Sequence, residues 1–149
     1  MSSTPTIEEL EQAVADIGYT LITDKVRHGG ITRFLDRTIT VDPRLRRREL
    51  RAILCHELIH AERGSFPGWV EPREEATVMR ETARRLIDFD QFIDAIKWAD
   101  SLEEVALELD VDFATVATYC RILTGEQAKL AERHAGRAFS TLRRRKKLR

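Results

Sequence analysis

The sequence predicts an α+β fold that is predominantly helical, with a small and mainly antiparallel sheet followed by a helical C-terminal half. The 149 residues, of which 42% are hydrophobic, suit one domain with a small appendage. Runs rich in β-branched and aromatic residues occur before residue 42. Beyond that point the apolar residues recur at helical spacing. The strands are therefore expected to precede the main helices.

The N-terminal segment predicts one helix and three strands. Thr6 and Glu9 have the spacing of a capping box, and Gly18 stands where a glycine commonly ends a helix. Strands are expected at residues 19–23, 31–35 and 38–41. The last two strands flank a short turn and should form a hairpin.

Asp42-Pro43 predicts the start of the helix that carries the central motif. Aspartate is a favoured N-cap residue and proline is tolerated at the first helical position, so this helix is expected over residues 43–63. Glycine and proline residues mark a loop over residues 64–72. Further helices are expected at residues 73–87, 91–99, 101–109, 112–123 and 126–135.

The run His56-Glu57-Leu58-Ile59-His60 predicts a catalytic zinc site. In a helix, His56 and His60 lie one turn apart on the same face, where two imidazoles can bind one Zn²⁺. Glu57 lies beside the first histidine, where its carboxylate can take a proton from zinc-bound water. Two of the four histidines of the chain occur in this run, which favours a site over a chance match.

A third zinc ligand is expected in the next helix, because a catalytic zinc has three protein ligands and one open position. A metzincin-type histidine is missing, since Phe66 stands where it would be. In the predicted helix 73–87, Glu75 lies on the apolar face one turn before Val78. Glu74 points towards a side that we interpret as solvated. Glu75 is therefore the expected ligand, with Glu74 as the alternative.

Four segments resemble the ImmA/IrrE family of metallopeptidases, and the resemblance extends over residues 31–130. These segments are Val41-Asp42-Pro43, Leu54-Cys-His-Glu-Leu-Ile-His-Ala61, Arg73-Glu-Glu75 and Ala83-Arg-Arg-Leu-Ile87. The sequence is most similar to the short actinobacterial and actinophage members. The zinc motif alone is common to many zincins, whereas its combination with the other segments is more specific.

The resemblance implies a zincin-like, gluzincin-type fold and a cytoplasmic, zinc-dependent endopeptidase. Some members of the family cleave helix-turn-helix repressors, so a transcriptional repressor is the expected protein substrate. By position, His56, His60 and Glu75 would hold zinc and Glu57 would be the base. Many members have alanine and a polar residue where this chain has Val78-Met79. The polar neighbour of the site is therefore missing or is supplied from elsewhere in the chain, and the choice between Glu74 and Glu75 stays open.

We divide the chain into a zincin-like domain over residues 1–99, a helix-turn-helix-like subdomain over residues 100–135 and a basic tail over residues 136–149. The second helix of the subdomain carries only Arg121 as a basic residue. Reading DNA requires phosphate and base contacts, so we interpret this segment as a packing or partner-binding element. The tail holds seven basic and no acidic residues. We interpret it as a solvated terminus rather than a nucleic-acid site.

A second hypothesis comes from a different functional class. The chain would be a DNA-associated regulator that uses the C-terminal helices and the basic tail, with zinc structural or vestigial. Glu57 favours the peptidase, because a structural zinc site has no use for a base. A membrane partner is not expected, since no apolar stretch is long enough to span a bilayer. Cys55 and Cys120 are interpreted as buried small side chains.

Overall fold

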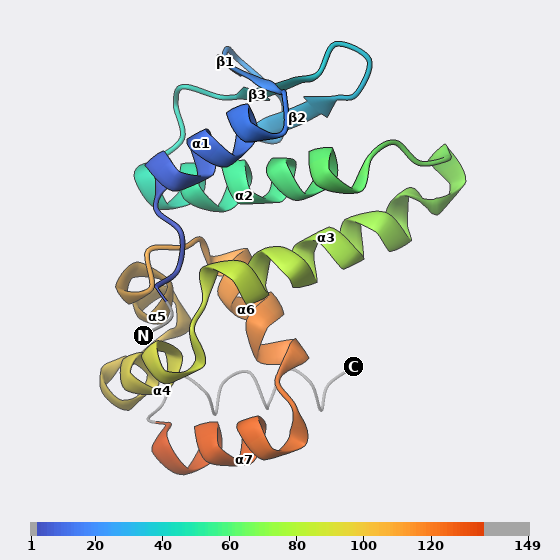
Figure 1. The fold of residues 1–149 in the computed structure, drawn as a ribbon. Helices are drawn as coiled ribbons and strands as arrows, with labels where there is room; N and C mark the ends of the chain where they lie inside the picture. Colours follow the sequence, from blue (N-terminus) through green and yellow to red (C-terminus); the bar gives the residue numbers. More distant parts are fainter. Residues whose placement is uncertain (1–2, 136–149) are drawn as a thin grey trace.

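The computed structural model describes residues 3–135 as an α+β fold in which helix α2 is the middle layer (Figure 1). The sheet and α1 lie on one side of α2, and α3 lies on the other, followed by the C-terminal helices. The elements are α1 (Ile7–Asp16), β1 (Thr20–Thr23), β2 (Gly30–Arg33), β3 (Thr38–Val41), α2 (Arg47–Arg63), the short 3₁₀ turn η1 (Gly68–Val70), α3 (Glu71–Leu86), α4 (Phe89–Trp98), α5 (Leu102–Glu108), α6 (Phe113–Ile122) and α7 (Gly125–His134). The predicted α+β class is confirmed.

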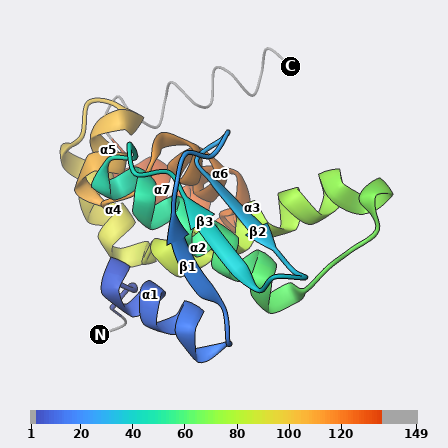
Figure 2. The ribbon, with the colours of Figure 1, turned by 90° about the horizontal axis from the view of Figure 1, so that it is seen from above.

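The sheet is mixed, with the strand order β1-β3-β2 (Figure 2). β2 and β3 form the predicted antiparallel hairpin, in which Thr32 lies opposite Ile39. β1 pairs with β3 in parallel, so the expectation of a mainly antiparallel sheet is wrong. The loop after β1 reverses the direction of the chain and places β2 two strand positions away from β1. β3 then pairs with both of them and occupies the central position. This order makes β2 an edge strand beside α2.

The helix that carries the motif begins at Arg47 and not at Pro43 as predicted. The carboxylate of Asp42 does not cap it. Instead Asp42 accepts hydrogen bonds from the backbone N–H of Val26 at 3.2 Å and of Arg44 at 2.9 Å. The guanidinium of Arg44 also bonds to it and holds the pKa of Asp42 well below its usual range. Asp42 therefore holds the loop before β2 in place through its hydrogen bond with the backbone of Val26.

Two other helices start earlier than predicted. α3 begins at Glu71, because Pro72 occupies the first turn, where the N–H it lacks has no partner in the helix. α4 begins at Phe89, because the side chain of Asp88 accepts a hydrogen bond from the backbone of Gln91 at 3.1 Å. Pro72, which was predicted to lie in the loop, and Asp88 thus each mark the start of a helix.

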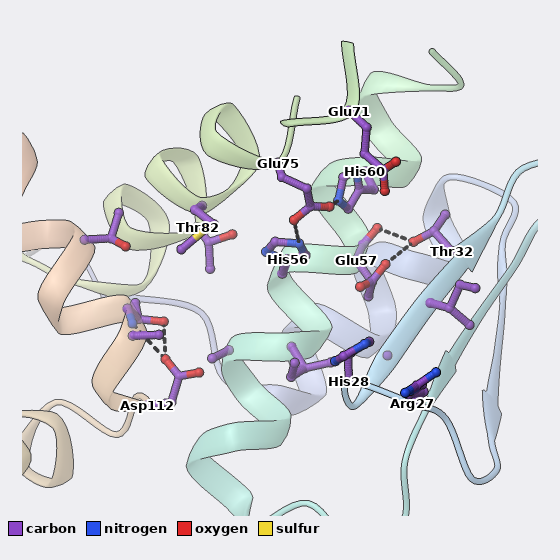
Figure 3. Close-up of a pocket in the computed structure, with 18 of the residues that line it drawn as sticks. Arg27, His28, Thr32, His56, Glu57, His60, Glu71, Glu75, Thr82 and Asp112 are labelled. Carbon is purple, nitrogen blue, oxygen red and sulfur yellow. Dashed lines mark hydrogen bonds and ion pairs between the residues drawn. The ribbon is translucent and has the colours of Figure 1, made fainter. Parts of the chain in front are cut away.

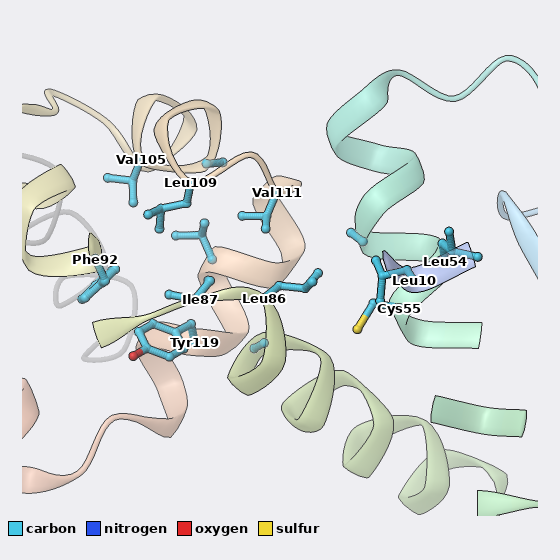
Figure 4. Packing of buried hydrophobic residues seen from close by; sticks show 14 of the residues in the cluster. Leu10, Leu54, Cys55, Leu86, Ile87, Phe92, Val105, Leu109, Val111 and Tyr119 are labelled. Atoms are coloured by element: carbon cyan, nitrogen blue, oxygen red, sulfur yellow. The ribbon is translucent and has the colours of Figure 1, made fainter. Parts of the chain in front are cut away.

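The buried hydrophobic residues form one cluster that extends from α1 to α7. Leu86 and Ile87, at the end of α3, lie near Val111 in the turn between α5 and α6 and near Tyr119 of α6 (Figure 4). The proposed division at residues 99 and 100 stays a prediction, and the basic tail over residues 136–149 lies outside the described residues. Within residues 3–135, no helix combines the length and the apolar character that crossing a bilayer requires.

The two cysteines are free thiols. Cys55 is buried in the core, and Cys120 is half-buried. Burial raises the pKa of each thiol to about 12. A thiol with so high a pKa is almost entirely protonated at neutral pH, so neither cysteine has the lowered pKa that is typical of a nucleophilic thiol.

A buried arginine joins three parts of the fold. Arg51 of α2 is only 4% exposed. Its guanidinium donates hydrogen bonds to the carbonyl oxygens of Pro5 at 2.9 Å and of Asp110 at 3.0 Å, and to the hydroxyl of Thr4 at 2.9 Å. It therefore connects the N-terminal segment and the turn between α5 and α6 to the helix that carries the motif.

Replacing Arg51 with methionine is expected to lower the free energy of unfolding by about 2–4 kcal/mol, because buried carbonyl oxygens would lose a charged donor. Arg47→Met is the matched control, since Arg47 is exposed on the same helix one turn earlier. We expect the control to change stability by less than about 0.5 kcal/mol. Urea unfolding measures both changes, and equal stability of the two variants would contradict the structural role of Arg51.

Candidate metal centre

The helix α2 places His56 and His60 on the same face, as their spacing predicts. Their rings lie 4.9 Å apart in an edge-to-face arrangement. The ring of Phe66, in the loop after α2, stacks on His60 with a centroid distance of 6.1 Å. Both imidazoles border the same cavity. The helix therefore presents two nitrogen donors in a fixed relation.

Glu75 of α3 approaches both histidines (Figure 3). Its Oε2 lies 3.0 Å from Nε2 of His56, and its Oε1 lies 2.6 Å from Nε2 of His60. The donor atoms of the three residues all lie within 4.8 Å of one another. Because α2 and α3 pack together, the fold brings Glu75 of α3 next to the two histidines of α2.

Glu74 does not reach the histidines, because Arg63 at the end of α2 binds it. The guanidinium of Arg63 donates to Oε2 of Glu74 at 3.0 Å and also to Oε1. This hydrogen bonding lowers the pKa of Glu74. The side chain of Glu74 is 13% exposed and that of Glu75 is 42% exposed. Our interpretation of the Glu74 side as solvated is therefore wrong, because Arg63 covers it.

Glu57 is buried, with 8% of its surface exposed, and borders the same cavity. The hydroxyl of Thr32 lies 2.7 Å from Oε2 of Glu57 and 3.0 Å from its backbone oxygen. A Cβ atom added to Gly30 would lie 2.6 Å from Cγ2 of Ile53 and 3.1 Å from Cγ of Glu57. Only glycine allows β2 to approach α2 so closely.

The cavity has a volume of about 590 Å³ and contains all four predicted site residues. The loop before β2 forms one part of its wall, with Arg27 and His28 (Figure 3). His28 is exposed and has a left-handed backbone with φ of 68°. The start of α6 forms another part of the wall, with Asp112 and Thr115. The C-terminal helices thus help to enclose the site.

The donor set fits a zinc ion. Zinc takes imidazole nitrogens and carboxylate oxygens at roughly 2.0–2.2 Å, so tetrahedral ligand atoms lie about 3.3–3.5 Å apart. The contacts of Glu75 with His56 and His60, at 3.0 and 2.6 Å, are slightly shorter, and a small outward movement of the carboxylate would admit the ion. Nδ1 of His60 is buried and has no hydrogen-bond partner among residues 3–135. A partnerless nitrogen agrees with the expectation from the sequence, in which Val78-Met79 stands where many members of the family have a polar residue.

Four further residues border the cavity without having been predicted from the sequence: Gly30, Thr32, Asp112 and Thr115. The pair Gly29-Gly30 carried a usable signal, because consecutive glycines often mark a close backbone approach. Thr32 carried none, since threonine is common in strands.

No protein-family model matches the chain, and neither curated proteins nor solved structures give a significant match. The resemblance to the ImmA/IrrE family thus stays an expectation that depends on the motif residues.

Proposed function

We propose that the chain is a zinc-dependent endopeptidase with a zincin-like, gluzincin-type fold, related to the ImmA/IrrE family. Its substrate would be a regulatory protein such as a helix-turn-helix repressor. One observation carries the proposal: Glu75 of a separate helix converges on His56 and His60, with Glu57 in the same cavity. Glu57 is buried at the wall of the cavity, which costs free energy for a carboxylate, and a role in the reaction would account for that burial.

His56, His60 and Glu75 would hold the ion. Zn²⁺ at such a site lowers the pKa of water and polarises a peptide carbonyl. The helix α2 orients both imidazoles, and the ring of Phe66 stacks on that of His60. The half-exposed carboxylate of Glu75 leaves one side of the group open to the cavity.

Glu57 would move the proton in the reaction. Its carboxylate accepts one proton from the attacking water while the water oxygen forms a bond to the carbonyl carbon of the peptide. Glu57 then passes that proton to the peptide nitrogen, the carbon–nitrogen bond breaks, and a new carboxyl group and a new amine leave. The carboxylate is unchanged at the end of the cycle.

The alternative of a DNA-associated regulator receives less support from the helices α5 and α6. Thr115 and Thr118 of α6 are buried, and α6 is packed against α3. A recognition helix presents such residues to the major groove, whereas here they face the protein and the cavity. Salt-dependent DNA binding by the whole chain would favour the alternative.

The test is zinc-dependent cleavage of a native partner. The chain is co-expressed with helix-turn-helix repressors encoded near its gene, and the fragments are mapped by mass spectrometry. We expect one specific cut that a zinc chelator abolishes and added zinc restores. A cut that persists in the chelator would contradict the mechanism.

A further inference from the structure

Thr32 contacts Glu57 through two acceptors at once. Its Oγ1 lies 2.7 Å from Oε2 of the carboxylate and 3.0 Å from the backbone oxygen of the same residue (Figure 3). A hydroxyl has one hydrogen, which it shares between these two oxygens or gives to either. One side chain of the sheet therefore holds both the carboxylate and the helical turn that carries it.

The strand that carries Thr32 is held firmly against the helix. Thr32 pairs with Ile39 of β3, and the side chain of Ile39 is fully buried. Two residues earlier on β2, Gly30 lies so close to Ile53 and Glu57 that a methyl group would not fit. These contacts on both sides limit how far the hydroxyl of Thr32 can move from Glu57.

The two oxygens of the carboxylate have different surroundings. Oε2 of Glu57 accepts the hydrogen bond from Thr32. In the part of the chain that the structure describes, Oε1 has no hydrogen-bond partner. It is also absent from the buried atoms that lack a partner, so it is accessible to solvent. Since Glu57 borders the cavity, Oε1 is the oxygen that a water molecule in the cavity can reach.

We propose that Thr32 is the positioning residue of Glu57: its hydroxyl holds Oε2, so that Oε1 faces the cavity and accepts the proton. This inference depends on the proposed peptidase function. A glutamate without this contact has several torsions free, and a displacement of about 1 Å can cost on the order of 100-fold in rate. Thr32 also borders the cavity, but the role assigned to it here is exerted through the carboxylate of Glu57.

The test compares three variants of the zinc-loaded chain on the repressor that it cleaves. Thr32→Val keeps the shape and the preference for a strand but removes the hydroxyl, whereas Thr32→Ser keeps the hydroxyl. We expect Thr32→Val to lower kcat by about 10–100-fold with little change in KM or zinc content, and Thr32→Ser to restore most of the rate. Thr38→Val, on the neighbouring strand, is the control and should cleave as fast as the wild type.

A measurement without substrate tests the same contact. Thr32→Val is introduced into the wild-type chain and into the Glu57→Ala variant, and its effect on Tm is compared. We expect the loss of Tm to be roughly 2–4 °C larger in the wild-type chain, because only there does the substitution remove a hydrogen bond to the carboxylate of Glu57. Equal shifts in both backgrounds would overturn the proposal.

The results separate this inference from the proposed function. If Glu57→Gln is inactive and Thr32→Val cleaves at the wild-type rate, the positioning role of Thr32 is wrong and the peptidase stands. Failure of Thr32→Ser to restore the rate also overturns it. If Glu57→Gln cleaves normally, the peptidase mechanism fails and the role of Thr32 fails with it.

Discussion

Glu57→Gln is expected to abolish cleavage of the native substrate while zinc content and Tm stay near those of the wild type. Glutamine has the size of glutamate but cannot act as a base. The loss of a general base typically lowers the rate on the order of 10²–10⁴-fold. The amide oxygen of glutamine can still accept the hydrogen bond that Thr32 gives to Oε2 of Glu57, so the local packing should be preserved.

The control for this variant is Glu49→Gln, which removes a carboxylate from the first turn of the same helix. Glu49 lies outside the residues that border the cavity, so the rate of cleavage should not change. Rates are measured as cleavage of the repressor at its mapped site, because a selective peptidase can fail to cleave generic proteins. Wild-type cleavage by Glu57→Gln would show that another group moves the proton.

The parts of the site that depend on local periodicity could be predicted from the sequence. The helical period alone puts His56 and His60 on one face. Glu75 was preferred to Glu74 because of the apolar face of its helix, but the side chain of Glu75 is 42% exposed and that of Glu74 is 13% exposed. Burial therefore does not separate the two residues, and the choice of Glu75 as the ligand stays a prediction. The sequence pattern could not show that Arg63, eleven residues away, binds Glu74.

The features that depend on contacts between distant segments could not be predicted. Thr32 lies 25 residues before Glu57, and neither residue has a pattern that connects them. The parallel pairing of β1 with β3 is of the same kind, because periodicity predicts strands but not their order in a sheet. Asp42 was assigned to the nearest helix, whereas its carboxylate bonds to Val26 across the loop.

Glu75→Gln is expected to weaken zinc binding by at least about 100-fold, since loss of a direct ligand should cost no less than the 10–100-fold typical of a supporting residue. Glu75 lies at 3.0 Å from His56 and 2.6 Å from His60, and a neutral amide is a poor zinc ligand in place of a carboxylate. Competition with a chelator of known affinity measures the change. His56→Ala should weaken binding at least as much.

Glu74→Gln is the matched control, because it makes the same chemical change one residue earlier in the same helix. Its carboxylate contacts Arg63 and not the histidines. We therefore expect nearly wild-type zinc affinity and a small loss of stability, up to about 1 kcal/mol, since Arg63 is partly exposed and solvent screens the pair. Equal zinc affinities of the two variants, or a weaker one for Glu74→Gln, would mean that Glu75 is not the third ligand. In that case Arg63 would have to release Glu74 when the metal binds, and Arg63→Met would then strengthen zinc binding instead of leaving it unchanged.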